Sequence, residues 1–134
     1  MTNANKVKGD SFERSITNYL VARGIDAVRT RAGYERDYGD IHIRRAATSV
    51  WPSAILQAKN HRTWKLAEWV RGLTRQTAEA KALHGALVVK RPGISAAGAQ
   101  YVVMELDAWL ALLERAGLVE RAELPTESDL ADIR

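Results

Sequence analysis

The chain has 134 residues, 46% of them hydrophobic and 27% charged, and it contains no cysteine. These values fit one globular domain, expected over residues 1–121 with an acidic tail over 122–134, and they exclude disulfides, thiolate zinc sites and cysteine nucleophiles. Residues 1–91 hold 17 Lys and Arg against 8 Asp and Glu, whereas residues 105–134 hold 3 against 8. A basic body favours a polyanionic partner, with nucleic acid as the default. No apolar run reaches the roughly 18 residues that cross a membrane, and the first residues are not of signal-peptide type, so we expect a cytoplasmic protein without a membrane partner.

The first half of the chain predicts one helix and three strands. Asp10 and Glu13 have the spacing of a capping box, so a helix is expected to begin at Asp10 and to end at Gly24. Residues 25–30 and 40–44 are expected to be extended. A third strand over 54–59 would pair with the second one as an antiparallel hairpin.

The second half predicts two helices and two strands. A long helix is expected over 63–84 with Gly85 as its end, followed by a buried strand over 86–89. A strand over 100–106 then leads to a helix over 108–116, capped by Asp107 and ended by Gly117. The order α-β-β-β-α-β-β-α predicts an α/β fold with a mixed central sheet flanked by helices.

Four polar side chains occur where packing does not require them: Glu13, Asp40, Gln57 and Lys59. Gln57 and Lys59 are two residues apart on one strand, so they leave the same face, while Asp40 opens the neighbouring strand. Oxygen ligands suit Mg²⁺, which can activate water for phosphodiester hydrolysis, and a lysine can neutralise the charge that develops. The backbone carbonyl of Ala58 would add a ligand. If these groups converge, they would form a hydrolytic site.

Asp40 together with Gln57-Ala58-Lys59 resembles the PD-(D/E)xK nuclease motif, and Lys8-Gly9 with Glu13-Arg14 resembles the archaeal Holliday-junction resolvases of that superfamily. The likeness spans roughly residues 6–106. It implies a restriction-endonuclease-like fold and DNA cleavage that depends on Mg²⁺, for which Mn²⁺ can substitute. It also implies a homodimer that nicks four-way junctions in symmetric pairs. The resemblance assigns Glu13 and Asp40 to the metal and Lys59 to catalysis, and we expect Gln57 and the Ala58 carbonyl to be further metal ligands. Such a short chain would suit a bacterial virus, and hence the host-cell cytoplasm.

The sequence departs from that motif at two positions. Gly39 stands where proline is expected, and Gln57 stands where an acidic residue is expected. An amide oxygen brings no charge, so metal affinity should fall unless Asp37 supplies a carboxylate. Glu13 also has a competing role, because a side chain folded back on Asp10 as a cap would not reach a metal.

Three alternative functions therefore stay open. The first is a restriction-type or repair-type duplex endonuclease of the same fold. The second is a non-catalytic junction-binding module whose site is degenerate at Gln57. The third is a nuclease directed at RNA.

Basic residues in the segments that flank the proposed site are expected to contact phosphates. The candidates are Lys8, Arg14, Arg29, Arg31, Arg36, Arg44, His61, Arg62 and Lys65, with Arg71 and Arg75 as further ones. Because no segment resembles a base-reading recognition helix, we expect recognition of DNA shape.

Overall fold

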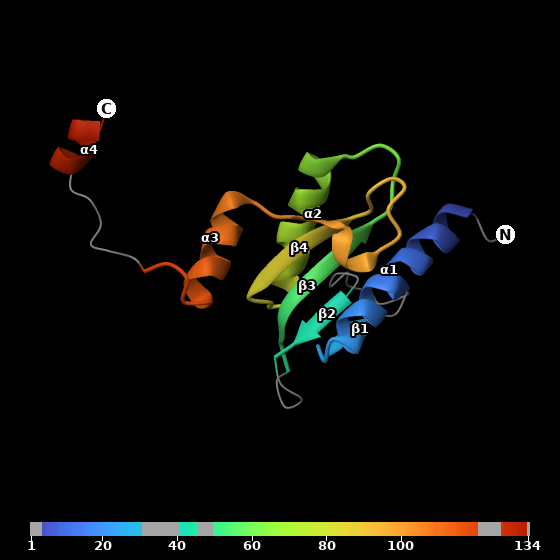
Figure 1. Ribbon diagram of the computed structural model, residues 1–134. Helices are drawn as coiled ribbons and strands as arrows, with labels where there is room; N and C mark the ends of the chain where they lie inside the picture. Colours follow the sequence, from blue (N-terminus) through green and yellow to red (C-terminus); the bar gives the residue numbers. More distant parts are fainter. Residues whose placement is uncertain (1–3, 31–40, 46–49, 121–126, 134) are drawn as a thin grey trace.

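In the described part of the chain, five strands form one mixed sheet with helices on both faces (Figure 1). The computed structural model describes residues 4–30, 41–45, 50–120 and 127–133. The strands lie side by side in chain order: β1 (Ala27–Arg29), β2 (Ile41–Arg44), β3 (Pro52–Lys59), β4 (His84–Val89) and β5 (Tyr101–Val103). β3 and β4 are parallel, and the other neighbours are antiparallel. The expected α/β class, a mixed sheet flanked by helices, is confirmed.

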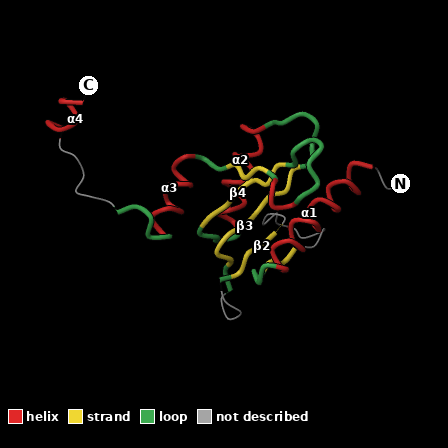
Figure 2. Tube along the Cα trace, viewed as in Figure 1, coloured by secondary structure: helices red, strands yellow, loops and turns green. Residues whose placement is uncertain are grey.

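Helices α1 (Ala4–Ala22) and α2 (Leu66–Glu79) lie on either side of the sheet, as the trace in Figure 2 shows. Helix α3 (Leu106–Arg115) contacts β4, and α4 (Glu127–Ile133) lies apart from the sheet (Figure 1). A 3₁₀ turn, η1 (Ala97–Ala99), contacts α1. The described elements thus include η1 and α4 beyond those expected. None of the described helices is both long and apolar enough to cross a bilayer.

The first helix begins earlier than expected, so the capping box at Asp10 and Glu13 is wrong. Asp10 lies well inside α1, which begins at Ala4. Gly9 does not prevent this, since a glycine inside a helix costs only about 1 kcal/mol relative to alanine. The expected end at Gly24 is confirmed, because Gly24 has a φ of 82°. The N–H of Ile25 there donates to the Leu20 carbonyl at 3.0 Å, as in a Schellman motif.

The predicted hairpin is formed by β2 and β3. Ile41 lies opposite Leu56 and His42 opposite Ile55, and the register shifts between Ile43 and Arg44. The alternation of apolar and polar residues in β2 explains this pairing, because Ile41 is fully buried on one face while His42 leaves the other. β3 begins at Pro52, two residues earlier than expected, and residues 31–40 and 46–49 lie outside the described residues.

Helix α2 is shorter than expected, and Gly85 does not end it. The helix ends at Glu79, and the chain turns through Lys81, which has a φ of 55°. Gly85 is instead the second residue of β4, where a Cβ would lie 2.1 Å from Thr77 Oγ1 on α2. Glycine is therefore required for the close approach of strand and helix. The next four residues, 86–89, are all buried, which confirms the predicted buried strand.

The C-terminal elements follow the expected pattern with shifted boundaries. The strand expected over 100–106 is confined to β5, and α3 has Glu105 as its N-cap. Asp107 is therefore in the first turn of α3, so its predicted capping role is wrong. Gly117 has a φ of 74°, which confirms the predicted end of that helix.

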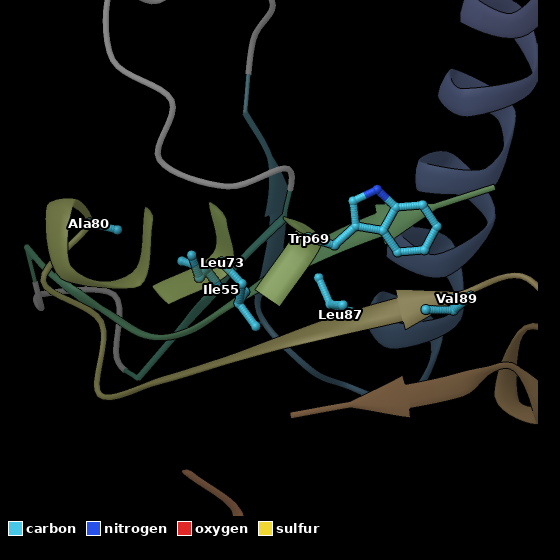
Figure 3. Close-up of a cluster of buried hydrophobic side chains, with 6 residues drawn as sticks. All are labelled: Ile55, Trp69, Leu73, Ala80, Leu87 and Val89. Carbon is cyan, nitrogen blue, oxygen red and sulfur yellow. The ribbon is translucent and has the colours of Figure 1, made fainter. Parts of the chain in front are cut away.

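The core has two parts, one on each face of the sheet. One cluster lies under α2 (Figure 3) and consists of Ile55, Trp69, Leu73, Ala80, Leu87 and Val89. The other lies under α1 and consists of Phe12, Ile16, Ala27, Ile41 and Val88, with Leu56 and Ala58 packed against it. Because side chains alternate along a strand, Gln57 and Lys59 leave β3 on the α2 side with Ile55, whereas Ala58 leaves it on the α1 side.

Candidate nucleic-acid interface

The carboxyl end of β3 carries three of the residues predicted for the site. Gln57 is 4% exposed and lies beside Leu87 of β4 in the parallel register. Lys59 is half-buried, with its ammonium nitrogen 5.7 Å from the ring centroid of Trp69. The predicted common face of Gln57 and Lys59 is confirmed by the packing of β3, and it is the face that α2 covers.

Glu13 lies on the other side of the sheet. Arg29 Nη2 donates a hydrogen bond to Glu13 Oε2 at 2.9 Å, and the same nitrogen is 3.7 Å from Asp10 Oδ1. Arg29 pairs with Ile41 in the β1–β2 register, so it belongs to the α1 face. The structure therefore brings Glu13 to a cation, and it does not bring Glu13 to Gln57 and Lys59.

Asp40, Asp37, Arg31 and Arg36 lie outside the described residues. Asp40 directly precedes β2 in the sequence. Its assignment to the site stays a prediction.

The described residues do not by themselves fit a magnesium centre. Among them, no three His, Asp or Glu side chains gather as a group that could hold a metal. Glu13 is paired with Arg29, and the Gln57 amide is uncharged. Mg²⁺ is normally held through at least one carboxylate, and neither Gln57 nor the Arg29-bound Glu13 provides an available one.

Two basic hollows, each of about 380 Å³, flank the end of β3. The described residues that line them include six Lys and Arg against one acid, Glu68. The hollow on the α2 side is lined by Gln57, Lys59, Glu68, Trp69, Arg71, Gly72, Arg75 and Gln76. The hollow on the α1 side is lined by Lys8, Gly9, Ala58, Asn60, His61, Arg62, Thr63 and Lys65. This excess of positive charge suits an extended polyanion.

His61 lies among these basic side chains. Burial, together with the ammonium groups of Lys59, Lys8 and Lys65, holds the pKa of His61 below its ordinary value of 6.5. The imidazole is therefore mainly neutral at pH 7. Its ring centroid lies 5.2 Å from that of Trp69. Sequence reasoning did not find Trp69 as the common support of Lys59 and His61, because periodicity does not reveal which helix covers which strand.

The other predicted DNA contacts are separated by the fold. Arg14 is exposed on α1, and Arg62 is exposed in the loop after β3. Arg44 lies at the far end of the hairpin, opposite Pro52, where its Nε pairs with Asp26 at 3.0 Å. The structure thus groups Lys8, His61, Arg62 and Lys65, together with Lys59, and places Arg44 elsewhere.

Comparison of the chain with models of known protein families and with curated proteins finds no match. Function is therefore inferred from the residues and from the geometry of this surface.

Proposed function

We propose that the protein binds DNA across the two basic hollows and cleaves it as a metal-dependent endonuclease. Its favoured substrate would be the four-way junction, which a homodimer would nick in symmetric pairs as a Holliday-junction resolvase. The observation that carries the proposal is the concentration of cations at the end of β3. There the charges of Lys8, Lys59 and Lys65 all lower the pKa of His61. Phosphate neutralisation by Lys and Arg supplies most of the affinity of proteins that bind DNA without reading bases.

The catalytic part of the proposal depends on the order of residues along the hairpin. Asp40 directly precedes β2, and Gln57-Ala58-Lys59 ends β3, its antiparallel neighbour. A mixed sheet with helices on both faces is what a restriction-endonuclease-like fold requires. In such a site, Lys59 would neutralise the charge that develops on the scissile phosphate.

The homodimer is supported by exposed apolar side chains near the C-terminal end of the fold. Val102 of β5 is 63% exposed, and Leu106 and Trp109 of α3 are 68% and 48% exposed. Apolar surface of this kind marks interaction sites. Two copies would also match the two-fold arrangement of strands in a four-way junction.

A cleavage assay tests the proposal. Labelled four-way junction and labelled duplex are each incubated with the protein in Mg²⁺, Mn²⁺ or EDTA. We expect paired nicks in the junction with either metal, no nicks in EDTA, and no cleavage by Asp40→Asn, which should still bind. Absence of junction cleavage by the wild type, or equal cleavage by Asp40→Asn, would refute the catalytic role. Equal cutting of the duplex would favour the restriction-type or repair-type alternative.

A non-catalytic junction-binding module is the second candidate function. It is favoured by the Glu13–Arg29 ion pair and by the neutral side chain at Gln57, which leave the described site short of carboxylates. This candidate predicts tight, salt-sensitive junction binding without cleavage. In the same assay, Gln57→Glu would then be the variant that gains activity, since it restores an acidic residue beside Lys59.

A further inference from the structure

The hollow on the α1 side of β3 is built from three separate segments. Lys8 and Gly9 come from α1, Ala58 from the end of β3, and residues 60–65 from the connection to α2. None of the described residues that line it is acidic. Its volume of about 380 Å³ accommodates a phosphate group with several waters, since one water occupies about 30 Å³. The chemistry of the hollow is therefore that of an anion site.

His61 is the histidine that lines this anion site. Its ring lies against Trp69, which is only 8% exposed and belongs to the core under α2. The imidazole therefore has a rigid support on one side, although His61, like Lys8 and Lys65, is exposed at the surface. The three lysines that repel a proton from His61, with Lys59 as the third, are the groups whose charge a bound phosphate would offset.

The charged groups near His61 come from several elements that meet at this end of β3, where Lys90, directly after β4, donates its backbone N–H to the Lys59 carbonyl at 2.9 Å. Lys8 belongs to α1, Lys59 to β3, and Arg62 and Lys65 to the connection. On α2, Glu68 lines the neighbouring hollow together with Lys59. In the free protein the balance is strongly positive, so a neutral imidazole is favoured.

We propose that this hollow is a phosphate subsite of the DNA-binding surface, in which His61 takes up one proton from solvent when a backbone phosphate enters. The inference rests on the proposed DNA binding, and it does not depend on cleavage. The entering phosphodiester stays a monoanion, and the new N–H of the imidazolium donates to one of its oxygens. Phosphate binding then raises the affinity of His61 for the proton, and protonation of His61 raises the affinity of the hollow for phosphate.

The sign of the pH dependence follows from the two protonation states. In the free protein the pKa of His61 lies below 6.5, and a bound phosphate raises it. DNA affinity should therefore increase as pH falls from the bound-state pKa to the free-state pKa. The change can reach about tenfold per pH unit, which is the limit for one linked proton. Outside this window His61 contributes no pH dependence.

Nuclear magnetic resonance of the histidine side chains in the full chain tests the linkage directly. The chain has three histidines, so their signals are separable. The probes are sulfate, a tetrahedral dianion of constant charge in this range, and a short single-stranded DNA. We expect both probes to raise the pKa of His61. His84 is the internal control, because its pKa is also lowered, by burial and by Arg115, at a place outside the hollow.

Binding of the four-way junction, measured by fluorescence anisotropy across the same pH range, gives the second readout. His61→Gln should bind like the wild type at high pH, but it should lose the gain in affinity at low pH. His84→Gln should keep the wild-type slope. The inference is overturned if DNA leaves the pKa of His61 unchanged, or if His61→Gln keeps the wild-type slope. A rise in pKa with sulfate but not with DNA would overturn the assignment to the DNA backbone, whatever the cleavage assay shows.

Discussion

At the scale of single residues, Arg29 forms a short ion pair with a carboxylate of α1. Its Nη2 reaches Glu13 at 2.9 Å and Asp10 at 3.7 Å, and its side chain is 29% exposed. Its Nε is buried and has no hydrogen-bond partner among the described residues. Arg29 thus depends on the α1 carboxylates for compensation of its charge, and Glu13 is the closer and more buried of the two.

Glu13→Gln should therefore destabilise the protein by about 1.5–3 kcal/mol, the range for hydrogen bonds to charged groups. Asp10→Asn is the matched control, because the Asp10 side chain is 52% exposed and its contact is longer, so its loss should cost at most about 0.5 kcal/mol. Urea denaturation of the two variants measures both values. Equal effects of the two substitutions would show that Glu13 is not the main partner of Arg29.

The positions of Gln57 and Lys59 show which part of the candidate site could be predicted from the residue pattern. Their two-residue spacing on an expected strand indicated a common face, and the packing of β3 confirms it. The spacing did not indicate that Glu13 would lie across the sheet. That placement depends on which face α1 covers, and this is decided by Phe12 and Ile16 packing on Ile41.

At the scale of the elements, the contact between α2 and β4 holds the helix against the face of the sheet from which Gln57 and Lys59 also leave. The contact depends on a glycine in the strand and on Thr77 in the helix. Thr77 Oγ1 donates to the Leu73 carbonyl at 2.7 Å, which holds its side chain against β4. An added methyl group at Gly85 would also lie 3.2 Å from Leu73 Cδ1. The two elements therefore cannot separate locally without disturbing the core.

Gly85→Ala should destabilise the protein by about 1–3 kcal/mol through overpacking. Gly72→Ala, in α2 itself, is expected to have the opposite effect on stability, because nothing lies within 4 Å of the added Cβ. Alanine inside a helix is favoured over glycine by up to about 1 kcal/mol, so this variant should be more stable than the wild type. Thermal unfolding of both proteins checks the two signs. A stable Gly85→Ala protein would contradict the close approach of β4 to α2.

At the scale of the whole molecule, charge is distributed along the chain in a way that bears on the proposed DNA binding. The segment 1–91 is basic and contains the residues of both hollows, whereas the segment 105–134 is acidic. Helix α4, within the acidic segment, lies apart from the sheet (Figure 1). An acidic segment on a DNA-binding protein opposes the approach of phosphate by long-range repulsion.

Deleting residues 122–134 should tighten junction binding by a few-fold at low salt, and the difference should vanish at high salt as the charges are screened. Replacing Glu123, Glu127, Asp129 and Asp132 with their amides keeps the length of the segment and separates charge from bulk. A salt titration of the affinity compares the three proteins. The charge explanation is contradicted if the deletion changes affinity and the amide variant does not.

The local features of this protein can be predicted from its amino-acid sequence. The alternation in 41–44 determined the hairpin of β2 and β3, the apolar run 86–89 determined a buried strand, and Gly24 and Gly117 determined two helix ends. The excess of basic residues in the first two thirds of the chain also predicts a polyanionic partner. Each of these features depends on neighbouring residues and on the period of one element, so it can be found without knowledge of the fold.

Only the tertiary structure decided which segments meet. It assigned Gly85 to a close strand–helix contact, Glu13 to Arg29, and Trp69 to the support of both Lys59 and His61. It also separated Arg44 from the other basic residues by placing it at the far end of the hairpin. The physical reason is that periodicity specifies which side chains share a face, whereas the partner of that face is selected by burial and charge between segments far apart in the chain.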